Sequence, residues 1–369
     1  PRLYFNGAGP TRLAADPSTD VTESVAGGLN NYGIPGAKSF HFLAAGYGSL
    51  QGVPVGLANP YFARMASSAS ATVLGDAMAQ SPTFFTLSEV GGNDVLGYAT
   101  SGGSGTDQSP STGNPTGNLD PSTYGTNDIT NPLVFDQVFR GMVATMTSGG
   151  AKGVIATVPD ITLLPFFTTV PFNPVPLDAA TVSAVNGAYA AYNGGIQQAF
   201  AFLVANTPMT EEMADAEIAK RTISFAVGAN AVVIMDEDLT DLTAINPGLI
   251  SMRQTTADDL LLLAGSAFIG TLADPNNPGS INGVAVPLGD QWVLTPEEQL
   301  AIRTATDAYN TTIATVAGSN PNIALVDFKG VLTEASSGIQ FDAYTMTTKL
   351  VTGGLVSLDG VHLTARGYA

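Results

Sequence analysis

Hydrophobic residues follow two periods along the chain, and their order predicts strands that alternate with helices. Runs rich in β-branched and aromatic residues predict buried strands at 83–90, 153–158, 231–235 and 323–327. Apolar residues recur every three or four positions over 133–146, which is typical of an amphipathic helix. This alternation predicts an α/β protein in which the four strands lie parallel in one sheet, with helices on both faces.

A second amphipathic helix follows a strong start signal. Thr295 fits the N-cap, Pro296 the first helical position and Glu298 the third. One face of this helix is predicted to consist of Ile302, Ala305, Tyr309, Ile313 and Val316. Residues 180–205 also predict a helix, but one that is interrupted near the glycine pair 194–195.

Much of the stretch 160–290 lacks a clear strand or helix period. Its first part, 160–178, is rich in Phe and Pro, and its last part reads as irregular turns. We therefore expect a single domain over 1–369, in which 160–290 is a large insertion that caps or flanks the core. The residues from Thr364 onward predict the first turn of a helix, so we expect a longer polypeptide.

The composition excludes several classes of function. The net charge is −18 with only 13 lysines and arginines, which argues against binding to nucleic acid. The absence of cysteine excludes disulfides, thiolate catalysis and thiolate metal sites. Charged residues make up only 12% of the chain, and a surface rich in Gly, Thr and Asn suits an exported protein.

Candidate chemistry lies near the carboxyl end. Asp359 precedes His362, one of only two histidines, by three residues. A short strand is expected at 353–358 and a helix from Thr364, and such a junction places side chains at the carboxyl edge of a sheet. At this spacing Asp359 can bind one ring nitrogen of His362 and leave the other free as a base. The alternative is a surface turn with an incidental histidine.

Two further loops offer hydrogen-bond donors. The loop 31–36 ends in Gly36, whose backbone can approach a substrate because it lacks a side chain. Asn93 lies in the turn after the strand at 83–90 and carries an uncharged amide donor. Together they would supply two donors to the oxyanion of an acyl-transfer reaction. Each also has a structural alternative, Gly36 as a turn glycine and Asn93 as a left-handed turn residue.

Taken in order, the three motifs N-Y-G-I-P-G, G-G-N-D and D-G-V-H-L-T-A-R-G-Y-A resemble blocks II, III and V of the SGNH, or GDSL, hydrolases. This resemblance implies a flavodoxin-like three-layer α/β/α fold and a serine esterase or lipase-like hydrolase that needs no cofactor. It implies that Gly36 and Asn93 donate to the oxyanion, that His362 is the general base and that Asp359 orients it. Leu363 stands where this family usually has proline.

The chain is most similar to a lipoprotein-like branch of this family, exported to the surface of Gram-negative bacteria. The resemblance therefore implies an extracellular or cell-surface location and a small ester substrate such as an acylated sugar or a lipid. Protein partners in a surface assembly are also expected. The rival hypothesis is a protein that keeps the fold without turnover and serves as a scaffold in a larger assembly.

The nucleophilic serine of the family is missing. It belongs to a G-D-S-L-like turn before the glycine block, and neither Ser18 nor Ser24 follows an apolar strand. Ser49, in Y-G-S-L, comes after Gly36 and lacks the aspartate. We therefore expect the nucleophile, with its strand, on an N-terminal segment upstream of Pro1 that stays associated with the chain.

Three remaining features have simpler interpretations. His41 lies in an apolar run and is expected to be a packed histidine. The acidic turn 236–241 offers oxygen ligands for Ca²⁺, but a solvated turn is the favoured interpretation, and no metal site is expected. Trp292 is expected to serve in packing.

Overall fold

The computed structural model describes residues 3–7, 9–16, 22–25 and 27–368. The chain divides into two compact units. The first comprises Pro1–Tyr98, Gly105–Leu164 and Ala301–Ala369, and the second comprises Ala99–Ser104 and Pro165–Leu300. The long segment of the second unit corresponds in position to the insertion that the sequence suggests at 160–290.

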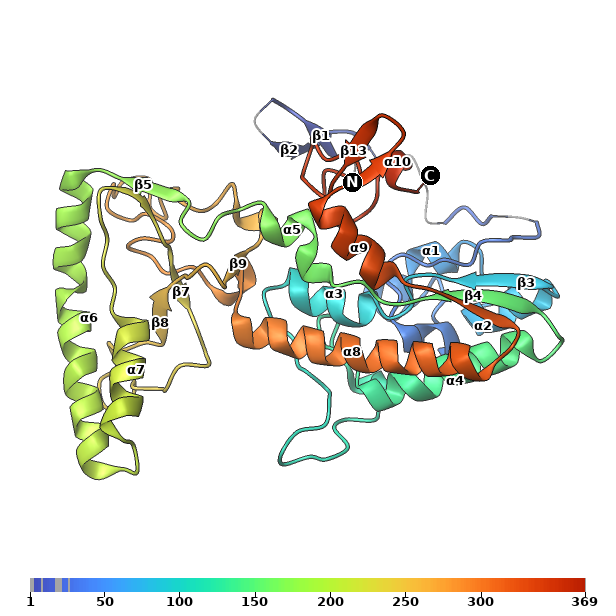
Figure 1. The fold of residues 1–369 in the computed structure, drawn as a ribbon, viewed down its shortest axis with the longest axis horizontal. Helices are drawn as coiled ribbons and strands as arrows, with labels where there is room; N and C mark the ends of the chain where they lie inside the picture. Colours follow the sequence, from blue (N-terminus) through green and yellow to red (C-terminus); the bar gives the residue numbers. More distant parts are fainter. Residues whose placement is uncertain (1–2, 8, 17–21, 26, 369) are drawn as a thin grey trace. The chain divides into compact units, whose positions relative to one another are not determined.

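A three-stranded parallel sheet forms the centre of the first unit (Figure 1). Its strands are β3 (Phe84–Leu87), β4 (Lys152–Ala156) and β11 (Ile323–Val326), in the order β11-β4-β3. Both pairings are parallel, with Phe85 opposite Gly153 and Ile323 opposite the same glycine. The mixed α/β architecture is thus confirmed, and three of the four predicted strands share one sheet.

The fourth predicted strand does not join this sheet. Strand β7 (Val233–Met235) pairs antiparallel with strand β8 (Met252–Gln254) in the second unit. The prediction for 231–235 was therefore right about the strand and wrong about its partner. A short run of buried apolar residues looks the same in either sheet, because distant contacts decide which strand it pairs with.

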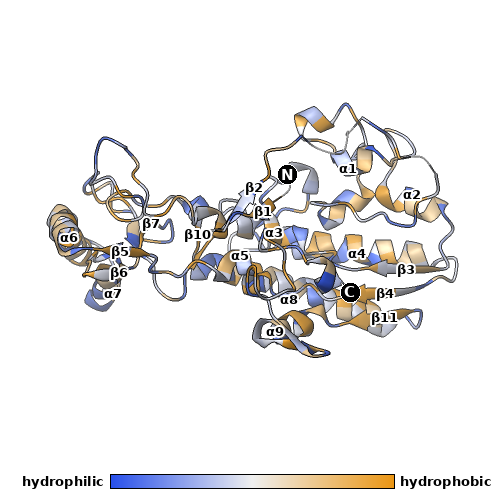
Figure 2. Cartoon of the chain, turned by 90° about the horizontal axis from the view of Figure 1, so that it is seen from above, coloured by the Kyte–Doolittle hydropathy of each residue, from blue (hydrophilic) through white to orange (hydrophobic). Residues whose placement is uncertain are grey.

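Helices pack around the sheet of the first unit. The helices that begin or end in this unit are α1 (Pro60–Ala63), α2 (Val73–Ala79), α3 (Asn93–Thr100), α4 (Pro132–Thr147), α8 (Pro296–Ser319), α9 (Phe328–Ser337) and α10 (Ala365–Tyr368). In Figure 1, α4 and α8 run side by side along the sheet, and Phe135 of α4 stacks on Tyr309 of α8 with ring centroids 4.4 Å apart. Both helices show hydrophobic and hydrophilic residues along their length in Figure 2, as amphipathic helices should.

The start of α8 follows its sequence signal. The N–H of Thr295 donates to Glu298 Oε2 at 2.6 Å, and the N–H of Glu298 donates to Thr295 Oγ1 at 3.4 Å. These reciprocal bonds form the capping box. The predicted apolar positions of the helix are all buried: Ile302, Ala305, Tyr309, Ile313 and Val316.

Short elements complete the first unit. They are two hairpins, β1 (Leu3–Phe5) with β2 (Pro10–Arg12) and β12 (Ile339–Phe341) with β13 (Tyr344–Met346), and the 3-10 helices η1 (Ser39–Leu43), η2 (Val53–Val55), η3 (Pro121–Thr123) and η4 (Ile161–Leu163). The predicted strand at 353–358 is not formed. Val356 makes only an isolated bridge to Leu363, because the chain turns back on itself between them.

The second unit has its own apolar core. Its elements are α5 (Pro165–Thr168), β5 (Val175–Leu177), α6 (Ala179–Asn206), α7 (Glu211–Arg221), β6 (Gly228–Asn230), β7, β8, β9 (Leu260–Leu261), η5 (Leu263–Gly265), η6 (Asp290–Trp292) and β10 (Val293–Leu294). Each strand pairs antiparallel, β5 with β6 and β9 with β10. Trp292 stacks on Phe268 at 5.1 Å, so it packs as expected.

Helix α6 is continuous over 28 residues, and the predicted interruption at 194–195 is wrong. A Cβ on Gly195 would lie 2.8 Å from Leu249 Cδ2, so this glycine allows close packing rather than ending the helix. Over the described residues, no helix is long and apolar enough to cross a membrane.

The packing of α4 predicts a difference between its two faces. Phe139 is 1% exposed in the core, whereas Leu133 on the same helix is 49% exposed. Phe139→Ala should lower the free energy of unfolding by about 3–5 kcal/mol, because it removes contacts and leaves a cavity. Leu133→Ala should cost less than about 1 kcal/mol. Urea denaturation of both variants measures these values, and equal losses would contradict the assigned orientation of α4.

Candidate active site

Gly36 lies in a tight turn whose geometry requires glycine. The N–H of Ala37 donates to the carbonyl of Ile34 at 3.1 Å, so Pro35 and Gly36 occupy the two central positions. Gly36 has a φ of 76°, as the third residue of a type II turn requires. Within the described residues its N–H has no hydrogen-bond acceptor. Gly36 therefore offers an exposed backbone donor.

Asn93 is held beside this turn. It is the first residue of α3, directly after the G-G turn that follows β3. Gly91 has a φ of 107°, and a Cβ there would lie 2.6 Å from Val158 Cγ2, so the turn packs tightly over the end of β4. Asn93 Nδ2 donates to the carbonyl of Ala37 at 3.1 Å. Since the amide group has two N–H bonds, the second remains for another acceptor.

A buried carboxylate connects the two loops. Asp94 is fully buried, and its two oxygens accept from the N–H of Ser39 at 2.9 Å and from Ser39 Oγ at 2.7 Å. Its carbonyl accepts from the N–H of Thr130 at 3.0 Å. Burial raises the pKa of Asp94, although the hydrogen bonds from Ser39 oppose this shift. The segment after Gly36 is thereby fixed against the first turn of α3.

No role was predicted for Ser39, Asp94 or Lys38. Lys38 is buried, and its Nζ donates to the carbonyls of Asp128 at 2.6 Å and Gly125 at 3.3 Å. These acceptors belong to the segment 101–132, which is buried at Asp128. The signal was the K-S pair between the glycine turn and the apolar run that starts at Phe40, since buried polar groups normally have hydrogen-bond partners.

His41 is a packed histidine, as expected. Its ring stacks on Tyr47 with centroids 4.4 Å apart and planes 7° apart. Its Nδ1 accepts from the backbone N–H of Lys38 at 3.0 Å. Burial, together with the charge of Lys38, lowers the pKa of His41 from 6.5 to about 4. His41 is therefore neutral at physiological pH and braces the segment after the glycine turn.

Asp359 and His362 form a hydrogen-bonded pair. Asp359 Oδ2 lies 2.8 Å from His362 Nδ1, within the distance expected of an orienting carboxylate. Asp359 Oδ1 accepts from Ser357 Oγ at 2.7 Å and from the N–H groups of Val361 and His362 at 2.9 and 3.0 Å. Burial opposes ionisation of Asp359, but these hydrogen bonds outweigh it and its pKa is lowered.

The ring of His362 is ready to act as a base. Its side chain is 66% exposed, and over the described residues Nε2 has no hydrogen-bond partner. Because the Asp359 carboxylate binds Nδ1, it favours the tautomer in which Nε2 carries a lone pair. Ser357 donates to the carboxylate rather than to the ring, so it orients Asp359 and is not placed as a nucleophile.

The four predicted site residues thus form two pairs. The first pair is Gly36 and Asn93, whose side chain donates to the carbonyl of Ala37, the residue after Gly36. The second pair is Asp359 and His362. Burial raises the pKa of Tyr368 in α10, and the charges of Glu89 and Asp359 raise it further.

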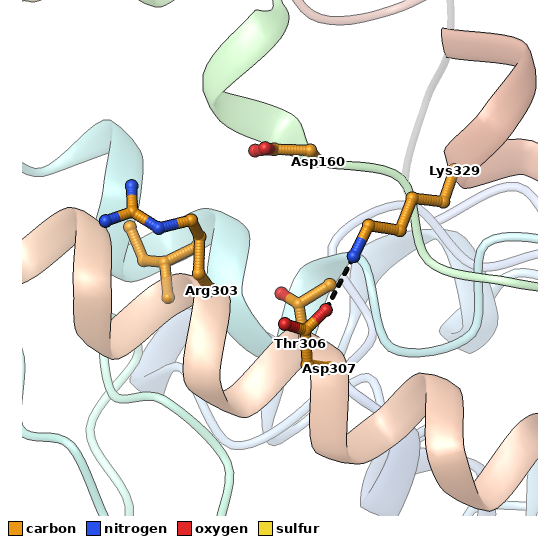
Figure 3. A pocket seen from close by; sticks show the side chains of 6 residues that line it. Asp160, Arg303, Thr306, Asp307 and Lys329 are labelled. Atoms are coloured by element: carbon orange, nitrogen blue, oxygen red, sulfur yellow. Dashed lines mark hydrogen bonds and ion pairs between the residues drawn. The ribbon is translucent and has the colours of Figure 1, made fainter. Parts of the chain in front are cut away.

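A small polar cavity lies near the ends of the other two strands (Figure 3). Asp160 follows β4 and Lys329 follows β11. The other lining residues belong to α8: Ile302, Arg303, Thr306 and Asp307. Lys329 Nζ binds Asp307 Oδ1 at 2.6 Å. The volume, about 40 Å³, holds a few waters and is too small for an organic ester.

The buried His41 predicts a specific pH dependence. Its folded pKa lies below its unfolded value, so the stability it contributes is present above pH 6.5 and is lost as the pH falls toward 4. The loss should reach about 2–3 kcal/mol. In His41→Asn, whose Oδ1 replaces the Nδ1 acceptor, this part of the acid sensitivity should disappear. Urea denaturation of both proteins over this range measures it, and parallel pH profiles would contradict it.

No family model matches this chain, and no curated protein or solved structure matches it either. The geometry of the two residue pairs and the sequence motifs are therefore the basis of the functional proposal that follows.

Proposed function

We propose that this protein is a serine ester hydrolase of the SGNH type, with a flavodoxin-like α/β/α core. The observation that carries the proposal is the Asp359–His362 pair, 2.8 Å apart, with the second ring nitrogen exposed. The N–H of Gly36, free within the described residues, and the second N–H of the Asn93 amide add two donors, and Asn93 is held beside the Gly36 turn by its bond to the carbonyl of Ala37. Acyl transfer by a serine requires a base that is oriented by a carboxylate and donors that bind the oxyanion.

Each group has a defined task in this mechanism. A serine hydroxyl attacks the ester carbonyl, and His362 Nε2 takes its proton. Gly36 and Asn93 donate to the oxyanion that forms, while Asp359 stabilises the imidazolium. His362 then gives the proton to the departing alcohol as the ester bond breaks. Water attacks the acyl-enzyme, with His362 again as the base, and the carboxylic acid leaves.

The open sheet favours a nucleophile on an additional strand. β3 lies at one edge of the sheet and β11 at the other, and parallel sheets are normally covered on both faces. Phe84 of β3 is 58% exposed and Leu325 of β11 is 42% exposed. A strand with a G-D-S-L-like turn beside β3, supplied by residues upstream of Pro1, would bring its serine to the carboxyl edge that holds Asn93.

The proposed substrates are carboxylic esters, among them acylated sugars and lipids, at the cell surface. The same open edge and exposed apolar residues also suit the alternative, a silent SGNH-fold scaffold whose partner covers β3. Catalytic turnover separates the two functions, because a scaffold needs neither the base nor the oxyanion donors.

The proposal predicts graded losses of ester hydrolysis in the protein that includes the upstream residues. His362→Ala should reduce kcat for p-nitrophenyl acetate by about 10⁴–10⁶, because the base is lost. Asn93→Ala should reduce it by about 10²–10³ through loss of one oxyanion donor, with little change in KM. Asp359→Asn should have a milder effect, because other groups can still orient the ring.

Asn276→Ala serves as the matched control, since Asn276 binds only Asp274 in an exposed turn of the second unit, and it should keep the parental rate. If the intact protein is inactive, or if His362→Ala keeps the parental rate, the hydrolase proposal fails and the scaffold takes its place.

A further inference from the structure

Three carboxylates converge in the second unit. Glu237 follows β7, Asp290 begins η6 and Glu298 lies in the first turn of α8. One oxygen of each lies within 4.8 Å of an oxygen of the other two. Glu237 is far from Asp290 and Glu298 in sequence, so the tertiary fold, and not a local acidic run, brings the three together.

Two oxygens of the cluster are buried without a partner. Glu298 is 4% exposed, and its Oε1 has no hydrogen-bond donor among the described residues, while Oε2 accepts from Thr295. Asp290 Oδ1 is also buried and has no hydrogen-bond partner among the described residues. Such oxygens cost free energy unless a proton or a cation binds them. Asp290 and Glu298 lie within hydrogen-bond reach of each other, but two ionised carboxylates cannot donate.

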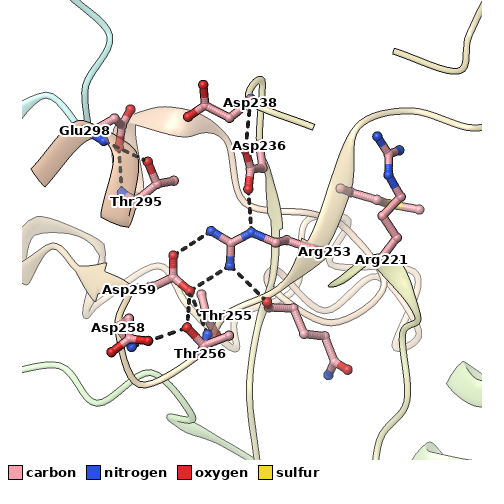
Figure 4. Close-up of polar contacts among 12 residues, drawn as sticks. Arg221, Asp236, Asp238, Arg253, Thr255, Thr256, Asp258, Asp259, Thr295 and Glu298 are labelled. Carbon is pink, nitrogen blue, oxygen red and sulfur yellow. Dashed lines mark hydrogen bonds and ion pairs between the residues drawn. The ribbon is translucent and has the colours of Figure 1, made fainter. Parts of the chain in front are cut away.

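The nearby Arg253 does not neutralise the cluster. Its guanidinium binds Asp259 through two hydrogen bonds of 2.7 Å and also pairs with Asp236 (Figure 4). The charge of Arg253 is therefore neutralised by Asp236 and Asp259, which lie outside the cluster. Glu298 lies instead beside two further carboxylates, those of Asp290 and Glu237.

A glycine loop closes over the buried carboxylate. Gly103 has a φ of 73°, and a Cβ there would lie 1.6 Å from Glu298 Oε1. A Cβ on the preceding Gly102 would lie 2.1 Å from the carbonyl oxygen of Asp290. Only a backbone without side chains fits here, so the loop covers Glu298 Oε1, whereas Glu237 is exposed.

We propose that Glu237, Asp290 and Glu298 bind one calcium ion. Each of the three carboxylates offers one oxygen as a metal ligand, and hard cations such as calcium prefer oxygen ligands. Calcium suits it better than magnesium because it accepts irregular geometry and 6–8 ligands. The exposed side at Glu237 gives access to the waters that complete the shell.

The ligand set differs from the acidic turn at 236–241. Asp236 binds Arg253, and Asp241 accepts from the N–H and Oγ1 of Thr243, so neither is free for a cation. Only Glu237 of this turn enters the cluster. The site lies in the second unit and is independent of the proposed hydrolase chemistry.

Calorimetric titration of the chelator-treated protein with calcium chloride tests the proposal. We expect saturable binding of one calcium per chain and a rise in the thermal midpoint, because a cation that binds only the folded state stabilises it. Magnesium chloride at the same ionic strength should bind more weakly. Equal stabilisation by sodium chloride at matched ionic strength, without saturable calcium binding, would overturn the proposal.

Isosteric variants locate the site. Glu298→Gln keeps an oxygen for the Thr295 cap, and Glu237→Gln changes an exposed residue that folding does not depend on. Each should weaken calcium binding by at least about 10-fold. Glu212→Gln, an exposed residue near the start of α7, removes the same charge and should bind calcium like the parent.

A shared proton between Asp290 and Glu298 is the competing explanation. In that case the parent binds no calcium, and Glu298→Gln raises the thermal midpoint because it removes a buried ionisable group. This result, or unchanged calcium affinity in the folded Glu237→Gln variant, would contradict the calcium site.

Discussion

The candidate active site depends on one buried interaction, the pair of hydrogen bonds from Ser39 to the carboxylate of Asp94. A carboxylate without solvent is costly unless donors satisfy it, and here the donors come from the segment directly after Gly36. The chain therefore cannot bury Asp94 without fixing that segment. Asn93 directly precedes Asp94, so its amide is held against the same segment by a constraint that involves no substrate.

The two halves of the site are held with different rigidity. The Gly36–Asn93 half is held in place by hydrogen bonds of buried groups, among them Ser39 and Lys38. The Asp359–His362 half sits in a turn whose order comes from local hydrogen bonds to Asp359, and its imidazole is 66% exposed. The candidate oxyanion donors, Gly36 and Asn93, are held rigidly, and the candidate base, His362, is more accessible. This arrangement is compatible with a site that is completed when another segment covers the edge at β3.

Local sequence patterns predicted much of the fold. The helix period over 133–146, the capping box at Thr295 and the spacing of Asp359 and His362 each depend on residues within one or two turns of each other. Their structures were predictable for that reason. The strand at 231–235 was recognised, but its sheet was not, because strand pairing is decided by distant residues.

Distance along the chain also explains what was missed in the sites. Ser39 and Asp94 are 55 residues apart, and Asp290 and Glu298 meet Glu237 only through tertiary packing. The glycines at 194–195 looked like a break, yet the close contact of Gly195 with Leu249 shows that packing can require glycine inside a helix. No periodicity or short motif encodes such contacts.

The most direct test of the hydrolase proposal is covalent labelling by a fluorophosphonate, which reacts with activated serines. The account predicts that, in the protein with its upstream residues, one serine before Pro1 is labelled and that His362→Ala abolishes the labelling. Mass spectrometry of the labelled peptide identifies that serine. Labelling of Ser49, labelling that persists without His362, or the absence of any labelled serine would contradict the account.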